Sequence, residues 1–247
     1  MDFRAWAPEY RRIRQEFGFS EEEDERAVEV LRELLRHHPG ALSREEAVRL
    51  LDHLVRGRRV WVVGPAGQPM PFRGPLFRRP PDVVVAADGA TTVCLRHGLI
   101  PDIIVTDLDG IIPDEIRACE GGAVVVVQAH GQNMSALRRW LPRFPGRIIG
   151  SGPTEPVPPI LNAGGFTDGD RAVYLAQAFQ AQEVVLVGFD FETAVAKGSG
   201  SPRLKQKKLF WARELLRTLA KQTPLRILSY DARGLYDWLA APPVEDR

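Results

Sequence analysis

A chain of 247 residues with 44% apolar and 26% charged side chains can bury a large hydrophobic core, and its near-cancelling charges, 33 basic against 32 acidic, predict no polyanion-binding surface for nucleic acid. No apolar run reaches the roughly eighteen residues of a membrane helix, and the N-terminus lacks the apolar core of a signal peptide. With two cysteines at no metal or disulfide spacing, the composition predicts a cytoplasmic protein without a nucleic-acid or membrane partner.

The N-terminal part of the chain has the pattern of helices. Ser20, with Glu23 three positions later, has capping-box spacing in front of apolar residues at helical intervals. A second helix is predicted to open with the same spacing at Ser43. We therefore predict an N-terminal helical appendage at residues 1–57, followed by an α/β catalytic domain at residues 58–247.

Short β-branched runs alternate with helical stretches in the rest of the chain. Each run is apolar on both faces, which is typical of parallel strands that helices cover on both sides. The pattern predicts the α/β fold class, with a mostly parallel sheet in a three-layer arrangement. The predicted strands are RRVWVVG (58–64), DVVVAADG (82–89), DIIVTDLDG (102–110), AVVVVQAHG (123–131), RIIGSG (147–152), EVVLVGFD (183–190) and LRILS (225–229).

Polar or glycine residues follow nearly every predicted strand. In open α/β sheets, ligands bind in the crevice beyond the carboxyl ends of the strands, so these residues are predicted to surround one site. They are Asp88-Gly89, Asp107 with Asp109, His130-Gly131, Ser151-Gly152 and Asp190.

Asp107 and Asp109 end the third predicted strand, and two residues apart on a strand they would share a face. Carboxylates that are pressed together need a shared proton or a cation between them. Oxygen ligands without nearby Cys or His favour Mg²⁺ over zinc. A helix cap or an Asx turn would explain a single aspartate equally well, but Asp88 at a neighbouring strand end favours a metal or catalytic role.

The segment GGFTDGDRAVYLAQAF (164–179) predicts a second part of the site. Thr167 and Asp170 have capping-box spacing before a helical pattern, so a helix N-terminus is predicted to direct its free amides at the site, where anions bind well. Asp168 and Asp170 can both serve as caps. Asp168 can alternatively accept hydrogen bonds from the amino group of a heterocycle.

Two further motifs leave alternatives open. In AHGQN, His130 and Asn133 are either ligand contacts or a core histidine and a helix cap. A basic run after the Gly/Ser stretch at 198–201 is either a solvated helix face or a lid that grips phosphate. The candidate phosphate-binding residues in this run are Arg203, Lys205 and Lys208.

The chain lacks the short motifs of several large enzyme classes. It has no GxxxxGK[ST] P-loop, no GxGxxG fingerprint after the first predicted strand and no GxSxG elbow. The P-loop NTPase, dehydrogenase and α/β-hydrolase interpretations are therefore disfavoured. Phosphate chemistry at the predicted acidic site would need another scaffold.

Five segments together closely resemble the archaeal 6-hydroxymethyl-7,8-dihydropterin diphosphokinases. The family looks distantly related to the thiamin diphosphokinases, so the resemblance implies their α/β catalytic fold over most of residues 58–230. The chain departs from the family pattern at Gln132, where Asp is usual, and at residues 64–67, where a GPSL-like turn is usual. The matching segments are ADGATT (87–92), PDIIVTDLDG (101–110), AHGQN (129–133), GGFTDGDRAV (164–173) and VGFDF (187–191).

The resemblance implies transfer of a diphosphoryl group from ATP to the hydroxymethyl oxygen of a reduced pterin, with Mg²⁺ as cofactor and AMP as product, in the synthesis of methanopterin or folate-type cofactors. It implies Asp88, Asp107 and Asp109 as the catalytic and metal-binding residues. A homodimer is expected by analogy only. The implied substrate-binding residues are Gly89, His130, Gly131, Asn133, Thr167, Asp168, Asp170 and Arg171.

Three other functions are compatible with the same residues. A thiamin diphosphokinase would use the same phosphorus chemistry on another acceptor. A nucleotide-sugar transferase would also use a metal-binding DxD pair, and a non-catalytic nucleotide or pterin sensor would keep the pocket without turnover. AMP release with pterin or with thiamin distinguishes the two diphosphokinases. Turnover of a UDP-sugar would indicate the transferase, and binding of ATP and pterin without turnover would indicate the sensor.

Overall fold

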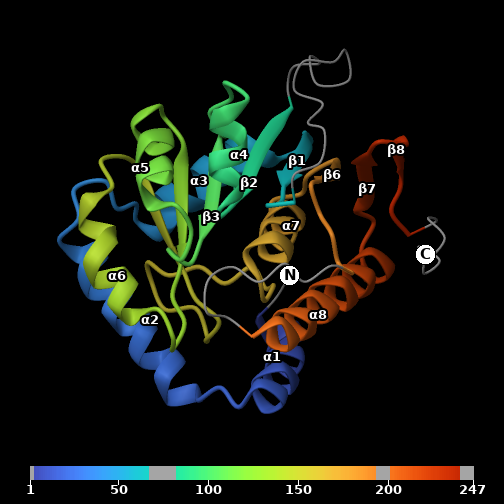
Figure 1. Ribbon diagram of the computed structural model, residues 1–247. Helices are drawn as coiled ribbons and strands as arrows, with labels where there is room; N and C mark the ends of the chain where they lie inside the picture. The colour runs from blue at the N-terminus through green and yellow to red at the C-terminus, as the bar shows by residue number, and fades with distance from the viewer. Residues whose placement is uncertain (1–2, 67–81, 193–200, 240–247) are drawn as a thin grey trace.

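The computed structural model describes residues 3–66, 82–192 and 201–239. Within these residues an eight-stranded sheet runs through the middle of the protein, with helices on both faces (Figure 1). Each predicted run contains a strand, although the last strand extends two residues beyond its run, to Asp231, and a short eighth strand that the sequence did not predict follows it. The strands are β1 Arg59–Val63, β2 Val83–Ala87, β3 Ile103–Thr106, β4 Val124–Gln128, β5 Ile148–Ser151, β6 Glu183–Val187, β7 Arg226–Asp231 and β8 Gly234–Asp237.

The strand order is β5-β4-β3-β2-β1-β6-β7-β8, and all neighbours are parallel except the antiparallel pair β7 and β8. The predicted α/β fold with a mostly parallel sheet is confirmed. From β1 the chain continues to β2 on one side, whereas from β6 it continues to β7 on the other. The carboxyl ends of β1 and β6 therefore flank a topological switch point, the place where such sheets bind ligands.

The apolar character of both strand faces follows from this burial. In β1, Val60 and Val62 point into one hydrophobic core, whereas Trp61 and Val63 point into the core on the opposite face. Successive side chains of a strand alternate between faces, so a strand covered on both sides needs apolar residues at every position. The three-layer arrangement that the sequence predicts is therefore present.

Eight α-helices in the described part of the chain form the outer layers. Helices α1, α3, α7 and α8 contribute to the core on one face, and α2, α4, α5 and α6 contribute to the cores on the other. None of the described helices is both long enough and apolar enough to cross a membrane. Their bounds are α1 Phe3–Phe17, α2 Glu21–Arg36, α3 Arg44–Val55, α4 Ala90–Arg96, α5 Ile112–Glu120, α6 Met134–Trp140, α7 Asp168–Ala178 and α8 Pro202–Gln222.

The N-terminal helices begin as predicted, because Ser20 caps α2 and Ser43 with Glu46 forms a capping box on α3. They also share the cores of the sheet. Trp6 of α1 lies in the same buried cluster as the β1 valines, and Leu31 of α2 lies in the cluster that contains Ile104 of β3. The predicted boundary after residue 57 therefore does not separate two hydrophobic cores.

Candidate active site

A cavity of about 770 Å³ lies beyond the carboxyl ends of the central strands. Its wall is formed by the segments that follow β1, β2, β3, β4 and β6, by the turn between α1 and α2, and by the first turns of α7 and α8. Small-molecule sites typically measure about 300–1,000 Å³. The cavity therefore lies where the sheet topology places a ligand site and is large enough to hold one.

Three aspartates converge in this cavity. Asp88 follows β2, and Asp107 and Asp109 follow β3. One carboxylate oxygen from each lies within 4.8 Å of the other two. Three carboxylates at this spacing repel one another unless a proton or cation lies among them, and their all-oxygen donor set fits a hard divalent ion such as Mg²⁺. The predicted convergence of these side chains is confirmed.

The reason for the convergence differs from the prediction. Strand β3 ends at Thr106, so Asp107 and Asp109 do not share a strand face. Leu108 between them has a φ of 68°, in the left-handed region that branched side chains rarely adopt. Its N–H donates to Thr106 Oγ1 at 2.9 Å, and the Asp109 N–H donates to Asp107 Oδ1 at 3.2 Å. A strained turn therefore brings the acids together.

Asp88 is linked through Thr106 to Glu115, a buried acid that the sequence analysis missed. Thr106 Oγ1 lies 3.2 Å from Asp88 Oδ1 and 3.2 Å from Glu115 Oε1. Burial, followed by the negative charge of Asp88, raises the pKa of Glu115 well above its ordinary value. Gly110 makes room for Asp88, because a Cβ there would lie 2.5 Å from Asp88 Oδ1. Glu115 lies inside α5, where no motif marked it.

The AHGQN motif fixes the position of Asp107. His130 Nε2 lies 3.2 Å from Asp107 Oδ2. The buried Asn133 amide donates to the carbonyls of Asp107 and Gln128 at 2.8 and 2.7 Å, and its oxygen accepts the His130 N–H at 3.0 Å. His130 and Gly131 line the cavity, but Asn133 does not. Asn133 therefore joins two loops and lies outside the cavity wall.

The electrostatics of Asp107 combine opposing effects. Burial alone would raise the pKa of its carboxyl, but the hydrogen bond and charge of His130, followed by the charge of Lys208, hold that pKa below the ordinary value. Asp168 differs, because burial and then the charges of Asp107, Asp88 and Asp109 raise its pKa well above the usual range. Negative charge is therefore concentrated at this point of the cavity.

Helix α7 begins at the capping box that the sequence predicted. Asp170 accepts hydrogen bonds from the N–H and the hydroxyl of Thr167, both at 2.6 Å, and from the Phe166 N–H at 2.9 Å. It is fully buried and does not line the cavity, so the structure places it as a helix cap instead of at the predicted substrate contact. Thr167 and Asp168 do line the cavity.

Arg171, one turn into α7, lines the cavity although it is only 5% exposed. Its Nη2 donates to the Phe166 carbonyl at 3.5 Å, and its Nε and Nη1 have no hydrogen-bond partner among the described residues. Burial lowers the pKa of this guanidinium. A buried cation with two unused donors is costly, and a ligand that supplies an acceptor would offset this cost.

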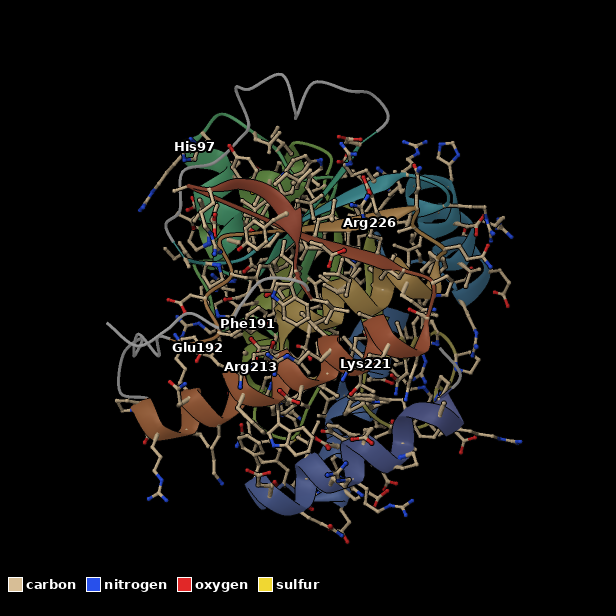
Figure 2. The ribbon with its side chains drawn as sticks, turned by 90° about the vertical axis from the view of Figure 1, so that its right-hand side faces the viewer. His97, Phe191, Glu192, Arg213, Lys221 and Arg226 are labelled. Carbon is tan, nitrogen blue, oxygen red and sulfur yellow. The ribbon has the colours of Figure 1, made fainter. Side chains whose placement is uncertain are left out.

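The remaining predicted residues divide between the cavity and its surroundings. Lys205 and Lys208 on the first turns of α8 line the cavity, whereas Arg203 is exposed and does not. Gly89 precedes α4 and is also absent from the wall. Most of the Gly/Ser stretch before the basic run lies outside the described residues. Arg213 of α8 pairs with Glu192, next to Phe191 of the cavity wall (Figure 2).

The N-terminal helices form a wall of the cavity that no motif indicated. The Tyr10 hydroxyl of α1 donates to Asp24 Oδ2 of α2 at 2.7 Å, and Asp24 Oδ1 accepts the Gly131 N–H at 2.9 Å. Phe19 from the turn before α2 and Glu23 from its first turn line the cavity beside them. The contact of Asp24 with Gly131 joins residues 107 positions apart, so sequence spacing could not reveal it.

Comparison with known proteins identifies the family. The model of the family described as 6-hydroxymethylpterin diphosphokinase MptE-like matches residues 76–195. A Pyrococcus furiosus protein named 6-hydroxymethyl-7,8-dihydropterin pyrophosphokinase is 41% identical over 239 residues, covering 93% of this chain and 99% of that protein. The chain belongs to the 6-hydroxymethyl-7,8-dihydropterin pyrophosphokinase family. A Methanothermobacter thermautotrophicus protein of the same name is 40% identical, covering 92% of this chain and 99% of that protein.

The resemblance that the sequence motifs indicated is thus confirmed. Among solved structures, the thiamine pyrophosphokinase of Bacillus subtilis is similar with a TM-score of 0.42 and 16% identity, covering 71% of this chain and 61% of that chain. Within this pyrophosphokinase family member, residues 76–195 contain the three aspartates, the AHGQN motif and all of α7. The wall formed by α1 and α2, and the lysines of α8, lie outside that segment.

Proposed function

We propose that this protein is a 6-hydroxymethyl-7,8-dihydropterin diphosphokinase. The pterin hydroxyl oxygen would attack the β-phosphorus of ATP, forming an oxygen–phosphorus bond as the bond from that phosphorus to the α,β-bridging oxygen breaks. AMP would leave, and the hydroxyl proton would be released to solvent. The observation that carries the proposal is the convergence of three carboxylate oxygens within 4.8 Å in a cavity of about 770 Å³, in a chain of this family.

The residues of the cavity divide the work. Asp88, Asp107 and Asp109 fit a divalent ion, and Mg²⁺ held there would neutralise charge on the ATP phosphates. His130 and Asn133 hold Asp107 in place. The amides at the start of α7, with Lys205 and Lys208, provide positive potential for phosphate oxygens. No side chain has to act as a nucleophile, because the acceptor supplies the attacking oxygen.

The test is an acceptor screen that measures AMP. Purified protein is incubated with ATP and either 6-hydroxymethyl-7,8-dihydropterin or thiamin, with and without Mg²⁺. We expect AMP with the pterin only, and only when Mg²⁺ is present. AMP formation with thiamin, turnover of a UDP-sugar, or binding of ATP and pterin without turnover in any divalent metal would each contradict the proposal and support one of the alternatives.

Two further properties stay predictions. The homodimer expected by analogy predicts a particle of twice the 27.6 kDa chain mass in sedimentation equilibrium. The product would be used to build a methanopterin or folate-type cofactor. A single species at the chain mass across the concentration range would contradict the dimer.

A further inference from the structure

The cavity has two chemically different ends, and the sheet order places them on opposite sides of the aspartates. Asp107 and Asp109 follow β3 and Asp88 follows β2. The segment after β4 lies on one side of them, whereas the segments after β1 and β6 lie on the other. Helix α2 packs against α6, which follows β4, so α2 belongs to the first end (Figure 1).

At this first end Glu23 presents an unused carboxylate. A Cβ at Gly131 would lie 2.7 Å from Glu23 Cβ and 3.4 Å from Glu23 Oε2, so the glutamate lies directly against this glycine at the cavity wall. Its neighbour Asp24 uses both oxygens, one for Gly131 and one for Tyr10. The Glu23 carboxylate has no hydrogen bond or ion pair with the other residues that the structure describes.

Arg171 adds a donor at the same end. It lines the cavity together with Tyr10, and its Nη2 donates to the carbonyl of Phe166. The Phe166 ring packs against Phe19, with centroids 6.4 Å apart, and both rings line the cavity. The first end thus combines aromatic surface, a free carboxylate and a buried guanidinium whose Nε and Nη1 lack partners among the described residues.

The opposite end has different chemistry. Phe189 and Phe191, which follow β6, supply aromatic surface there, and Arg213 of α8 pairs with Glu192 beside them. The carboxylate at this end, Asp190, accepts the Glu192 N–H at 2.9 Å. The base of a nucleotide can stack on these rings, and the carboxylate at this end already has a backbone partner, whereas Glu23 at the first end has none among the described residues.

Reduced pterins present two adjacent donors, the 2-amino group and N3–H, beside a 4-oxo acceptor. One carboxylate can accept both donors at once, whereas the base-pairing edge of adenine offers a donor next to an acceptor. On the basis of the proposed function, we propose that Glu23 accepts hydrogen bonds from the 2-amino group and N3–H of the pterin. Arg171 donates to the 4-oxo group, and ATP occupies the Phe189 end.

This arrangement also orients the reacting group. The pyrimidine edge and the hydroxymethyl group lie at opposite ends of the long axis of a pterin. Anchoring the pyrimidine edge at Glu23 therefore directs the hydroxymethyl oxygen towards Asp88, Asp107 and Asp109, which lie between the two ends of the cavity. The start of α2 thus becomes the part of the protein that selects the acceptor.

The decisive experiment compares Glu23→Gln with Glu25→Gln, an exposed acid of the same helix outside the cavity wall. Steady-state AMP release gives kcat and KM for ATP, for 6-hydroxymethyl-7,8-dihydropterin and for its analogue without the 2-amino group. A hydrogen bond to a charged group is worth roughly 10-fold or more in binding. We expect Glu23→Gln to raise the pterin KM by about 10-fold while leaving the ATP KM unchanged.

The analogue separates recognition from general structural damage. The unsubstituted protein and Glu25→Gln should prefer the pterin to the analogue by about 10-fold, and Glu23→Gln should lose this preference. An unchanged pterin KM and preference in Glu23→Gln would overturn the assignment while leaving the diphosphokinase function intact. If only Asp168→Asn lost the preference, the pterin amino group would bind Asp168 of α7, and the assignment to Glu23 would be overturned. If the unsubstituted protein released no AMP with pterin, the proposed function itself would fail.

Discussion

Several contacts hold Asp107 in position, so its charge can be changed without changing its position. The left-handed Leu108 fixes the turn, Asn133 binds the backbone carbonyl of Asp107, and His130 contacts its carboxylate. None of these contacts requires the negative charge of the Asp107 carboxylate. Changing its charge should therefore leave the turn in place while removing one ligand of the candidate metal site.

Asp107→Asn, and separately Asp109→Asn, should lower kcat for AMP formation by at least about 100-fold at saturating Mg²⁺, because a neutral amide is a poor ligand for a hard cation. The melting temperature should stay close to that of the unsubstituted protein. Asp52→Asn on the exposed face of α3 is the matched control and should retain activity. Near-normal turnover by both site variants would refute the metal assignment.

At the scale of elements, local signals predicted most of the helix and strand starts. The capping boxes at Ser43 and Thr167 lie where α3 and α7 begin, and each predicted strand was recognised because both of its faces are apolar. The four residues of β8 escaped prediction, because Gly234–Asp237 is short and is not continuously apolar. Its pairing with β7 depends on the turn at Asp231 instead.

The contact between α2 and the loop after β4 depends on Gly131. Alanine there would place its Cβ 2.7 Å from Glu23 Cβ and 3.3 Å from the Glu23 backbone carbon, so the helix would have to move. We expect Gly131→Ala to lower the free energy of unfolding by roughly 1–3 kcal/mol and to raise the pterin KM more than the ATP KM. Urea unfolding and steady-state kinetics measure both effects. Unchanged stability and kinetics would show that the helix is not held there.

The β7–β8 hairpin contains an acid with a pH-dependent contribution. The hydrogen bond from Arg233 lowers the pKa of Asp231 to about 2. Partial burial opposes this shift, and the hydrogen bond from Tyr236 adds to it. The unfolded chain therefore binds a proton first as the pH falls, so the stabilisation is present at neutral pH and is lost between about pH 4 and 2. Solvent screening keeps it below about 1 kcal/mol.

Asp231→Asn should therefore lower the free energy of unfolding at pH 7 and should lower it less at pH 3. Urea unfolding at both pH values measures the difference, with Asp237→Asn on the same hairpin as the control. An equal loss at both pH values would mean that the lost hydrogen bonds to Arg233 and Tyr236, and not the charge of the carboxylate, cause the effect.

At the scale of the whole molecule, the predictability of the site follows from the topology. The three aspartates could be placed together because parallel strands bring their carboxyl ends to one edge of the sheet. The link from Tyr10 through Asp24 to Gly131 could not be predicted, because it depends on how distant helices pack. Asp24 in the sequence is simply one of four acids in the first turn of α2, a common position for acids.

The same packing predicts how the protein unfolds. Trp6 of α1 and Leu51 of α3 lie in the core cluster that contains the β1 valines, and Leu31 of α2 lies in a second cluster with the strands. The N-terminal helices therefore cannot leave without exposing apolar surface of the sheet, at a cost of about 25 cal/mol for each Å². They should unfold together with the sheet, in one cooperative transition.

Native-state hydrogen exchange at increasing urea measures this coupling. We expect amides in the middle of α2 and α3 to exchange with the same free energy and urea dependence as those of β1 and β6, because both groups open only through global unfolding. The amides of β8, at the sheet edge, serve as the internal control and should exchange through smaller openings. If α1 to α3 lost protection at clearly lower urea than the sheet, the N-terminal helices would be a separate unit after all, as the predicted boundary after residue 57 implied.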